Sequence, residues 1–251
     1  MIHIVGAGPG DPELLTIRAK RIIDSADVIL FADSLVNQDI LIDSKAKVII
    51  RTSDLNIDEI NGMVYDYYMK GMDIARIHSG DPAIYGAIND EISFYKKNNL
   101  DFDIVPGIPS LFAASAKIGI ELTSPGTTQT IIITRVPRRT EIFENEDLSM
   151  LAAHKTSIAI FLSASNSKNV VKKLLKAGYS ENDSAIIAYK ISWPDEKIIL
   201  TTIGNIEKSL FENRINRQAL ILVGGNVSAY SDKKSFLYSP DFTHLFRKST
   251  K

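Results

Sequence analysis

The 251-residue sequence contains no cysteine, which excludes disulfides, thiolate-bound zinc, iron–sulfur clusters and thiol nucleophiles. Long hydrophobic runs are also missing: apolar stretches such as Val28–Ala32 and Ile158–Leu162 are far shorter than the roughly 18 residues that a membrane span needs. The first residues, Met1–Gly6, show neither the basic nor the apolar region of a secretory signal. We therefore expect a soluble, cytoplasmic protein with no membrane partner.

Neither sign of charge dominates, since 29 Lys and Arg stand against 30 Asp and Glu, a net charge of −1. No global basic field exists to attract nucleic acid, so we expect no nucleic-acid partner. The four histidines are scattered, with no His-x3-His pair: His3, His78, His154 and His244. We therefore expect no metal bound by the protein.

The stretch Arg76–Gly86 is the feature around which the sequence is organised. A short apolar strand ends at Ser79-Gly80-Asp81-Pro82, which cannot continue it. Apolar side chains then recur at helical spacing, which predicts a helix that closes at Lys96 and Lys97: Tyr85, Ile88, Ile92 and Tyr95. Ligands of open α/β sheets bind outside such carboxyl ends of strands, although an ordinary strand-to-helix turn is the alternative.

The same strand–turn–helix pattern fills the first half of the chain. Strands are predicted at 2–5, 27–32, 47–50, 73–77 and 102–105, with helices after Pro12 and at 57–67 and 110–118. Asp11 is expected to cap the helix that begins at Pro12. Five strands alternating with helices indicate an α/β domain with a parallel sheet covered on both faces.

The turn cluster Ser124–Thr127 is the predicted domain boundary, which gives domains at 1–123 and 124–230 and a tail at 231–251. The predicted strands beyond it lie at 129–134, 157–162, 184–190, 197–201 and 219–223, with helices near 170–175 and at 205–212. The turn Trp193-Pro194-Asp195 joins two adjacent strands as a hairpin. The second sheet should therefore be mixed.

Four turns broken by glycine, proline or serine directly follow strands, at 6–12, 79–82, 106–110 and 163–165. Such turns offer main-chain groups to a flat polar ligand, and a nucleoside suits them better than a triphosphate because no phosphate-binding loop is present. The glycine spacing in 6–10 does not match the dinucleotide-binding fingerprint. Ser163-Ala164-Ser165 lacks the flanking glycines of a nucleophile elbow, which argues against a serine hydrolase.

Several charged residues at strand ends are candidates for function. Asp33 and Asp81 could serve catalysis or could cap helices, which is the commoner use of aspartate there. His78 could face a ligand, but a hydrogen-bonded structural histidine is favoured. Arg135 could pair with substrate carboxylates, whereas Arg138 and Arg139 are expected on a solvated loop.

Two long segments, Val5–Thr16 and Gly80–Gly86, resemble the signatures of the tetrapyrrole methylase family, and the resemblance extends over roughly 2–225. Finer features are similar to the branch that methylates precorrin-4 in cobalamin synthesis: Ala32–Val36, Thr128–Ile131, Tyr189–Lys197 and the tail segment Tyr238–His244. The resemblance implies two α/β domains with a cleft that holds S-adenosylmethionine, a homodimer, and methylation of carbon 11 of precorrin-4 or its cobalt form.

The resemblance also implies which residues contact the cofactor: Pro9, Ser79, Gly80, Asp81, Ile84, Tyr85, Pro109, Ser110, Leu162, Ile191, Ala219 and Leu220. Pro109 replaces a threonine that is common in the family, so a hydroxyl contact is either missing or supplied by Ser110. Asp33 is expected to orient the substrate or relay a proton, and Arg135 to bind its carboxylates. The polar stretch 136–150 is predicted to be a mobile loop beside the cleft.

Other functions stay open at this point. A methylase of the same fold could act at carbon 20 or 17 of the macrocycle, or on RNA ribose or a protein side chain. The near-zero net charge counts against RNA. A protein that binds S-adenosylmethionine without turnover is the alternative that is not an enzyme. Whether the substrate already holds cobalt is also open.

Overall fold

The computed structural model describes residues 1–138, 142–225, 227, 243, 247 and 248. It divides into two compact units. The first comprises Met1–Ala113 together with Lys190–Glu196, and the second comprises Ala114–Tyr189 and the described residues from Lys197 onward. The division lies at Ala113, whereas the sequence analysis puts a boundary at Ser124. The segment Lys190–Glu196 therefore joins a unit far from it in sequence.

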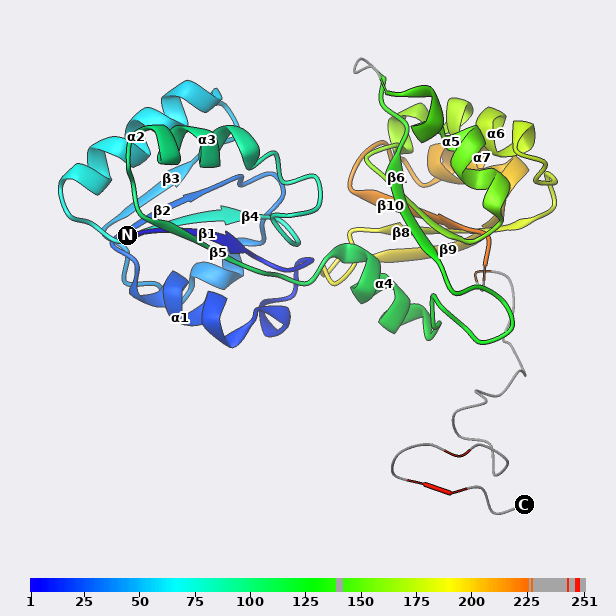
Figure 1. Ribbon diagram of the computed structural model, residues 1–251, viewed down its shortest axis with the longest axis horizontal. Coiled ribbons are helices and arrows are strands. Elements are labelled where there is room, and N and C mark those ends of the chain that lie inside the picture. The colour runs from blue at the N-terminus through cyan, green and yellow to red at the C-terminus, as the bar shows by residue number, and fades with distance from the viewer. Residues whose placement is uncertain (139–141, 226, 228–242, 244–246, 249–251) are drawn as a thin grey trace. The chain divides into compact units, whose positions relative to one another are not determined.

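The first unit contains a five-stranded parallel sheet, as predicted (Figure 1). Its strand order is β3-β2-β4-β1-β5, which differs from the 3-2-1-4-5-6 order of the dinucleotide-binding fold. The strands are β1 (Ile2–Gly6), β2 (Val28–Phe31), β3 (Val48–Arg51), β4 (Ile74–His78) and β5 (Phe102–Val105).

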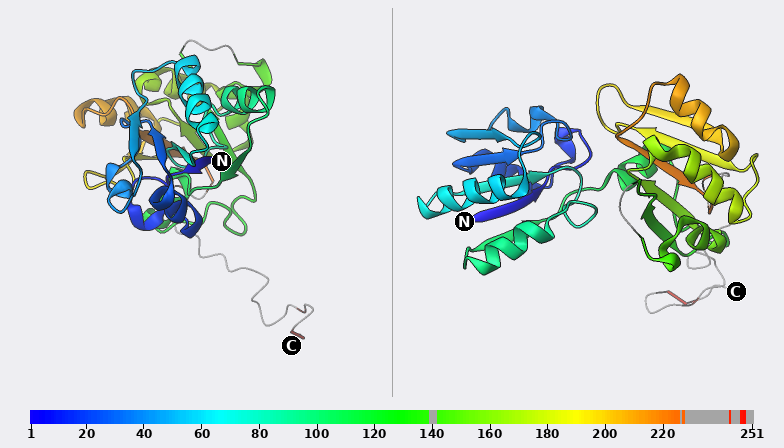
Figure 2. Two further views of the ribbon diagram at one scale, coloured as in Figure 1. Left: turned by 90° about the vertical axis from the view of Figure 1, so that its left-hand side faces the viewer. Right: turned by 90° about the horizontal axis from the view of Figure 1, so that it is seen from above.

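Helices cover both faces of this sheet: α1 (Ile17–Ser25) lies on one face, and α2 (Ile57–Met69) and α3 (Asn89–Lys97) on the other (Figures 1 and 2). Successive strand side chains point to opposite faces, so each face has its own core. Ile23 of α1 packs in the same cluster as Phe31, and Val64 of α2 and Tyr95 of α3 pack with Ile4. All five of these side chains are at most 1% exposed, which explains why the strands read as continuous apolar runs.

Two helices of the first unit begin later than the sequence predicts. Asp11 caps a short 3₁₀ helix, Pro12–Leu14, and α1 starts only at Ile17, where the Thr16 hydroxyl accepts a hydrogen bond from the Ala19 amide at 3.1 Å. Tyr85 was expected in the helix that is α3, but it has a φ of +56° in the turn before it. A residue with positive φ cannot belong to a right-handed helix, so the helix begins at Asn89.

The second unit contains the predicted mixed sheet, in the order β6-β7-β10-β8-β9. Only β6 and β7 pair in parallel, and β8 and β9 form the expected hairpin. The strands are β6 (Ile131–Arg135), β7 (Ser157–Phe161), β8 (Ser184–Tyr189), β9 (Lys197–Thr202) and β10 (Ala219–Val223). The sheet thus differs from the first in having three antiparallel pairings.

Three helices, α5 (Leu148–Leu151), α6 (Ser167–Lys176) and α7 (Ile206–Glu212), pack on one face of the second sheet around Leu148, Leu174 and Leu210 (Figure 1). The helix α4 (Ser110–Ile118) contains the division between the units. Of the predicted loop 136–150, Glu144–Glu146 and α5 are helical, and 139–141 lie outside the described residues. The tail segment 238–244 also lies outside them, except Thr243. No described helix is long and apolar enough to cross a membrane.

Candidate functional site

Three turns meet at the carboxyl ends of β1, β4 and β5. The first and second are joined by a pair of main-chain hydrogen bonds: the Gly8 amide donates to the Gly80 carbonyl (3.1 Å), and the Gly80 amide donates to the Gly8 carbonyl (2.8 Å). The Asp81 carboxylate accepts a hydrogen bond from the Gly107 amide at 2.9 Å, which joins the second turn to the third. We call the segments 8–11, 79–82 and 107–110 the turn cluster.

The turns approach so closely that side chains are excluded between them. A Cβ atom added to Gly107 would collide with the Gly80 carbonyl oxygen, and one added to Gly6 would lie 2.6 Å from the Gly107 nitrogen. Asp81 also accepts from the Ala83 amide at 2.8 Å, so both carboxylate oxygens bind main-chain amides. Where these turns meet, few side chains lie between them, as the sequence predicts for turns of this composition.

A buried ionic network lies behind the second turn. Glu91 of α3 is 2% exposed and accepts hydrogen bonds from Arg76 Nε (2.9 Å). Its other oxygen lies 3.2 Å from His78 Nε2, and Arg76 also donates to the Thr52 hydroxyl (3.4 Å). Burial raises the pKa of Glu91, but the hydrogen bond from His78 and the charge of Arg76 outweigh it and leave that pKa below its usual value.

This network fixes the end of β4. His78 is hydrogen-bonded and 9% exposed, so it is the structural histidine that the sequence analysis favours. Its carbonyl accepts a hydrogen bond from the Ala7 amide at 2.8 Å, directly before the second turn begins. Glu91 is not among the residues predicted from the sequence. Arg76 and His78 could have indicated it, because they lie two residues apart on an apolar strand, share one buried face and require an acidic partner there.

The other predicted site residues of the first unit differ in exposure. The Ser79 and Tyr85 side chains are exposed, and Ile84, Pro109 and Ser110 are half-buried. Pro9 and Ile191 are buried, and Ile191 is in the segment Lys190–Glu196. Asp33 follows β2 at the same sheet edge, where the Ser53 hydroxyl donates to its carboxylate (2.6 Å) and lowers its pKa. Most of these residues thus lie near the carboxyl ends of the parallel strands.

The remaining predicted residues share one edge of the second sheet. Arg135 ends β6 opposite Phe161, and Leu162 follows β7 with a φ of +51° and 64% exposure. Ala219 begins β10 at the same edge, paired with Tyr189. Ala219 and Leu220 are buried, at 8% and 3% exposure. Arg138 is exposed, as expected, and Arg139 lies outside the described residues.

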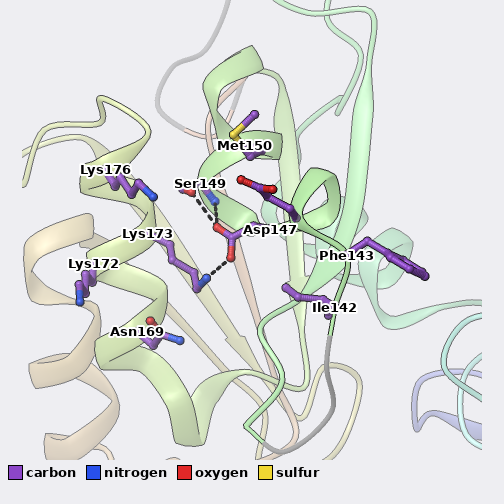
Figure 3. Close-up of a pocket in the computed structure, with 10 residues that line it drawn as sticks. Ile142, Phe143, Asp147, Ser149, Met150, Asn169, Lys172, Lys173 and Lys176 are labelled. Atoms are coloured by element: carbon purple, nitrogen blue, oxygen red, sulfur yellow. Dashed lines mark hydrogen bonds and ion pairs between the residues drawn. The ribbon is translucent and has the colours of Figure 1, made fainter.

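A hollow of about 350 Å³ lies beside α6 in the second unit (Figure 3). Lys172, Lys173 and Lys176 line it, and Lys173 pairs with Asp147. Partial burial raises the pKa of Asp147, but hydrogen bonds from Lys173 and Ser149 lower it to about 2. None of the predicted site residues lines this hollow.

The turn cluster fits a nucleoside-like cofactor better than a metal ion. Its turns bring few side chains to this end of the sheet apart from Ser79 and Ser110, which carry hydroxyls. Among the residues that the structure describes, no group of three or more His, Asp or Glu side chains is placed to hold a metal ion. The chemistry of the site is therefore that of main-chain amides, carbonyls and hydroxyls.

Comparison with known proteins identifies relatives over the full length. The model of the tetrapyrrole (corrin/porphyrin) methylases matches residues 1–207. Cobalt-precorrin-4 C(11)-methyltransferases of Priestia megaterium and Methanocaldococcus jannaschii are each 43% identical to this chain. Each match covers 100% of this chain, with 98% of the first relative and 97% of the second. Precorrin-4 C(11)-methyltransferase of Pseudomonas aeruginosa is 37% identical, over 98% of each chain.

Solved structures agree with this family. A cobalt-precorrin-4 methyltransferase superposes with a TM-score of 0.86 at 43% identity, over 89% of this chain and 94% of its own. A uroporphyrin-III C-methyltransferase of Thermus thermophilus, complexed with S-adenosylhomocysteine, shares the fold with a TM-score of 0.74 at 23% identity, over 90% and 92%. The family resemblance of Val5–Thr16 and Gly80–Gly86 is confirmed: the chain belongs to the tetrapyrrole (corrin/porphyrin) methylase family.

Proposed function

We propose that the chain transfers a methyl group from S-adenosylmethionine to carbon 11 of precorrin-4 in cobalamin biosynthesis. The observation that carries this proposal is the 43% identity, over the whole chain, to two cobalt-precorrin-4 C(11)-methyltransferases. The relative named for precorrin-4 without cobalt is 37% identical, which favours the cobalt form as substrate. Cobalt then belongs to the macrocycle and not to the protein.

The turn cluster is the part of the first unit that we propose to hold the cofactor. The hydroxyls of Ser79 and Ser110 suit the ribose and the amino-acid portion, and Ile84 and Pro109 supply apolar contact. Both oxygens of Asp81 already bind amides, so Asp81 shapes the turns more than it touches the ligand. When bound, the sulfonium supplies an electrophilic methyl group to an electron-rich macrocycle carbon.

Leu162, Ala219 and Leu220 are proposed as further cofactor contacts, as the family resemblance implies. Arg135 is proposed to bind a carboxylate of the tetrapyrrole, because a guanidinium pairs with carboxylates in two hydrogen bonds. Holding both substrates at reacting distance contributes most of the catalysis when no enzyme nucleophile is needed.

Asp33 is proposed to orient the substrate as a hydrogen-bond acceptor. The hydroxyl of Ser53 donates to its carboxylate and lowers its pKa, so Asp33 is ionised at neutral pH. An ionised carboxylate can accept a proton or a hydrogen bond but cannot donate one. We also propose a homodimer, as the family resemblance implies, and a cytoplasmic location, as the short apolar runs of the sequence favour.

The test is a methylation assay with S-adenosylmethionine and separate tetrapyrroles that present carbon 11, 17 or 20, with and without cobalt. We expect one new methyl group at carbon 11 by NMR, formed faster on the cobalt form. A methyl group at another carbon would assign the chain to a different step. Binding of S-adenosylhomocysteine without transfer to any macrocycle would favour a protein that binds the cofactor without turnover.

A further inference from the structure

The segment Lys190–Glu196, which connects β8 to β9, holds the first turn of the turn cluster by side-chain hydrogen bonds. Trp193 Nε1 donates to the Pro9 carbonyl at 3.0 Å, and the Ser192 hydroxyl accepts from the Asp11 amide at 3.0 Å. These partners are 184 and 181 residues apart in the sequence. The first turn is therefore held from outside its own strand and helix.

The indole ring also covers Gly10. A Cβ atom added there would lie 2.5 Å from Trp193 Nε1, so a glycine is required at this position. On the other side, Asn37 Nδ2 donates to the Gly10 carbonyl at 2.9 Å. Two consecutive carbonyls and the next amide of this turn thus bind side chains of Trp193, Asn37 and Ser192 instead of a neighbouring strand. We call these three side chains the clamp.

The main chain of Lys190–Glu196 has an unusual conformation beside the indole of Trp193. Lys190 and Ser192 both adopt positive φ, +44° and +67°, an unusual conformation for residues other than glycine. It is stabilised by the Lys190–Asp195 ion pair (2.7 Å) and by the Ser192 amide, which donates to Glu196 at 2.9 Å. Trp193 itself is only half-buried, so global packing does not account for its contacts.

We propose that Trp193 is a positioning residue that fixes the Gly8–Asp11 turn in the conformation that binds S-adenosylmethionine. This inference rests on the proposed function, because the turn is a cofactor site only in that case. Coupling between a ligand and a contact is reciprocal: if the clamp strengthens cofactor binding, the bound cofactor strengthens the clamp by the same factor. Trp193 is the only tryptophan of the chain, so its fluorescence reports this contact directly.

The experiment measures S-adenosylhomocysteine binding by calorimetry for the wild-type chain, Trp193→Phe and Tyr68→Phe. Tyr68→Phe is the matched control, because the Tyr68 hydroxyl also binds main chain: it accepts a hydrogen bond from the Asp101 amide (3.1 Å). Asp101 precedes β5, so this contact lies at the amino ends of the strands, away from the turn cluster. We expect about fivefold weaker binding for Trp193→Phe, the size of one hydrogen bond, and no change for Tyr68→Phe. The KM for S-adenosylmethionine should rise by the same factor while the KM for the tetrapyrrole stays constant.

Two further measurements need no substitution of the indole. Saturating S-adenosylhomocysteine should shift the Trp193 emission of the wild-type chain, and Ser192→Ala should speed hydrogen exchange of the Asp11 amide. Unchanged affinity in Trp193→Phe, or an emission that does not respond to bound ligand, would overturn the clamp and leave the proposed function standing. A wild-type chain that binds no S-adenosylhomocysteine would overturn the proposed function itself.

Discussion

The two sheet edges of this molecule are built in opposite ways. At the edge of the parallel sheet, main-chain hydrogen bonds join the first turn to the second, and the Asp81 carboxylate joins the second turn to the third. At the edge of the mixed sheet, the strand ends carry large side chains: Arg135 is the last residue of β6, and the exposed Leu162 follows β7. We propose the first edge for the cofactor and the second for the carboxylates of the tetrapyrrole.

The two units also contain ion pairs of different kinds. Glu91, behind the first edge, is buried with two basic partners, whereas Asp147 and Lys173 in the second unit are 22% and 21% exposed. Removing one member of a buried pair leaves an uncompensated charge and costs about 3–5 kcal/mol, whereas a pair near the surface contributes about 0–1 kcal/mol. The buried network around Glu91 should therefore contribute more to stability than the Asp147–Lys173 pair.

The largest effect is expected from Glu91→Gln. Losing the carboxylate leaves Arg76 buried without its partner and should lower the free energy of unfolding of the first unit by about 3–5 kcal/mol. Urea unfolding followed by Trp193 fluorescence measures this, because Trp193 belongs to the first unit. Asp147→Asn in the second unit, followed by far-UV circular dichroism, is the matched control and should cost less than about 1 kcal/mol. Similar losses in the two variants would remove the contrast between the two units.

Asp81→Asn should act on the turn cluster without unfolding the chain. An amide can keep one acceptor oxygen, but its NH₂ group would face either the Gly107 amide or the Ala83 amide. Losing one charge-assisted hydrogen bond, about 2 kcal/mol, predicts roughly thirtyfold weaker binding of S-adenosylhomocysteine by calorimetry. The control is Asp58→Asn, at an exposed carboxylate of α2. Equal affinity in the two variants would mean that the joined turns do not form the cofactor site.

Local patterns predicted the elements of both units but not what holds the turns. The strands, the parallel and mixed sheets, and the hairpin at Trp193 follow from apolar runs and turn residues. The helix starts at Pro12 and Tyr85 were predicted too early, because a 3₁₀ turn and residues with positive φ precede α1 and α3. Glu91 and Trp193 were missed as supports, since their contacts join residues distant in the sequence.

The second edge is tested by Arg135→Ala. If Arg135 binds a tetrapyrrole carboxylate, the KM for the tetrapyrrole should rise about tenfold, the lower end of the range for a hydrogen bond to a charged group. Binding of S-adenosylhomocysteine should not change, since the turn cluster stays intact. Arg135→Lys should recover part of the loss, because lysine keeps the charge but not the two-hydrogen-bond geometry. Arg138→Ala, at an exposed arginine, is the control. A KM that rises equally for Arg138→Ala would indicate general attraction and no specific contact.

The smallest effect is expected from Lys173→Met, and its pH dependence separates it from Glu91→Gln. The pKa of Asp147 is about 2 in the folded chain against an ordinary value of 3.8, so the stability it gains from Lys173 is present above pH 3.8 and is lost as the pH falls toward 2. The difference between wild type and Lys173→Met should therefore be below about 1 kcal/mol near neutral pH and vanish below pH 2 in urea titrations.

For Glu91 the folded pKa is also lowered, so its contribution is present above its ordinary value of 4.5 and declines as the pH falls below that value. As the pH falls, the first unit should therefore lose stability before the Asp147–Lys173 pair does. The loss of stability in the first unit should also be larger. The measurement is acid unfolding of the wild-type chain, followed by Trp193 fluorescence for the first unit and by far-UV circular dichroism for the whole. If the two transitions coincide, and Lys173→Met and Glu91→Gln shift them equally, the two ion pairs contribute equally to stability.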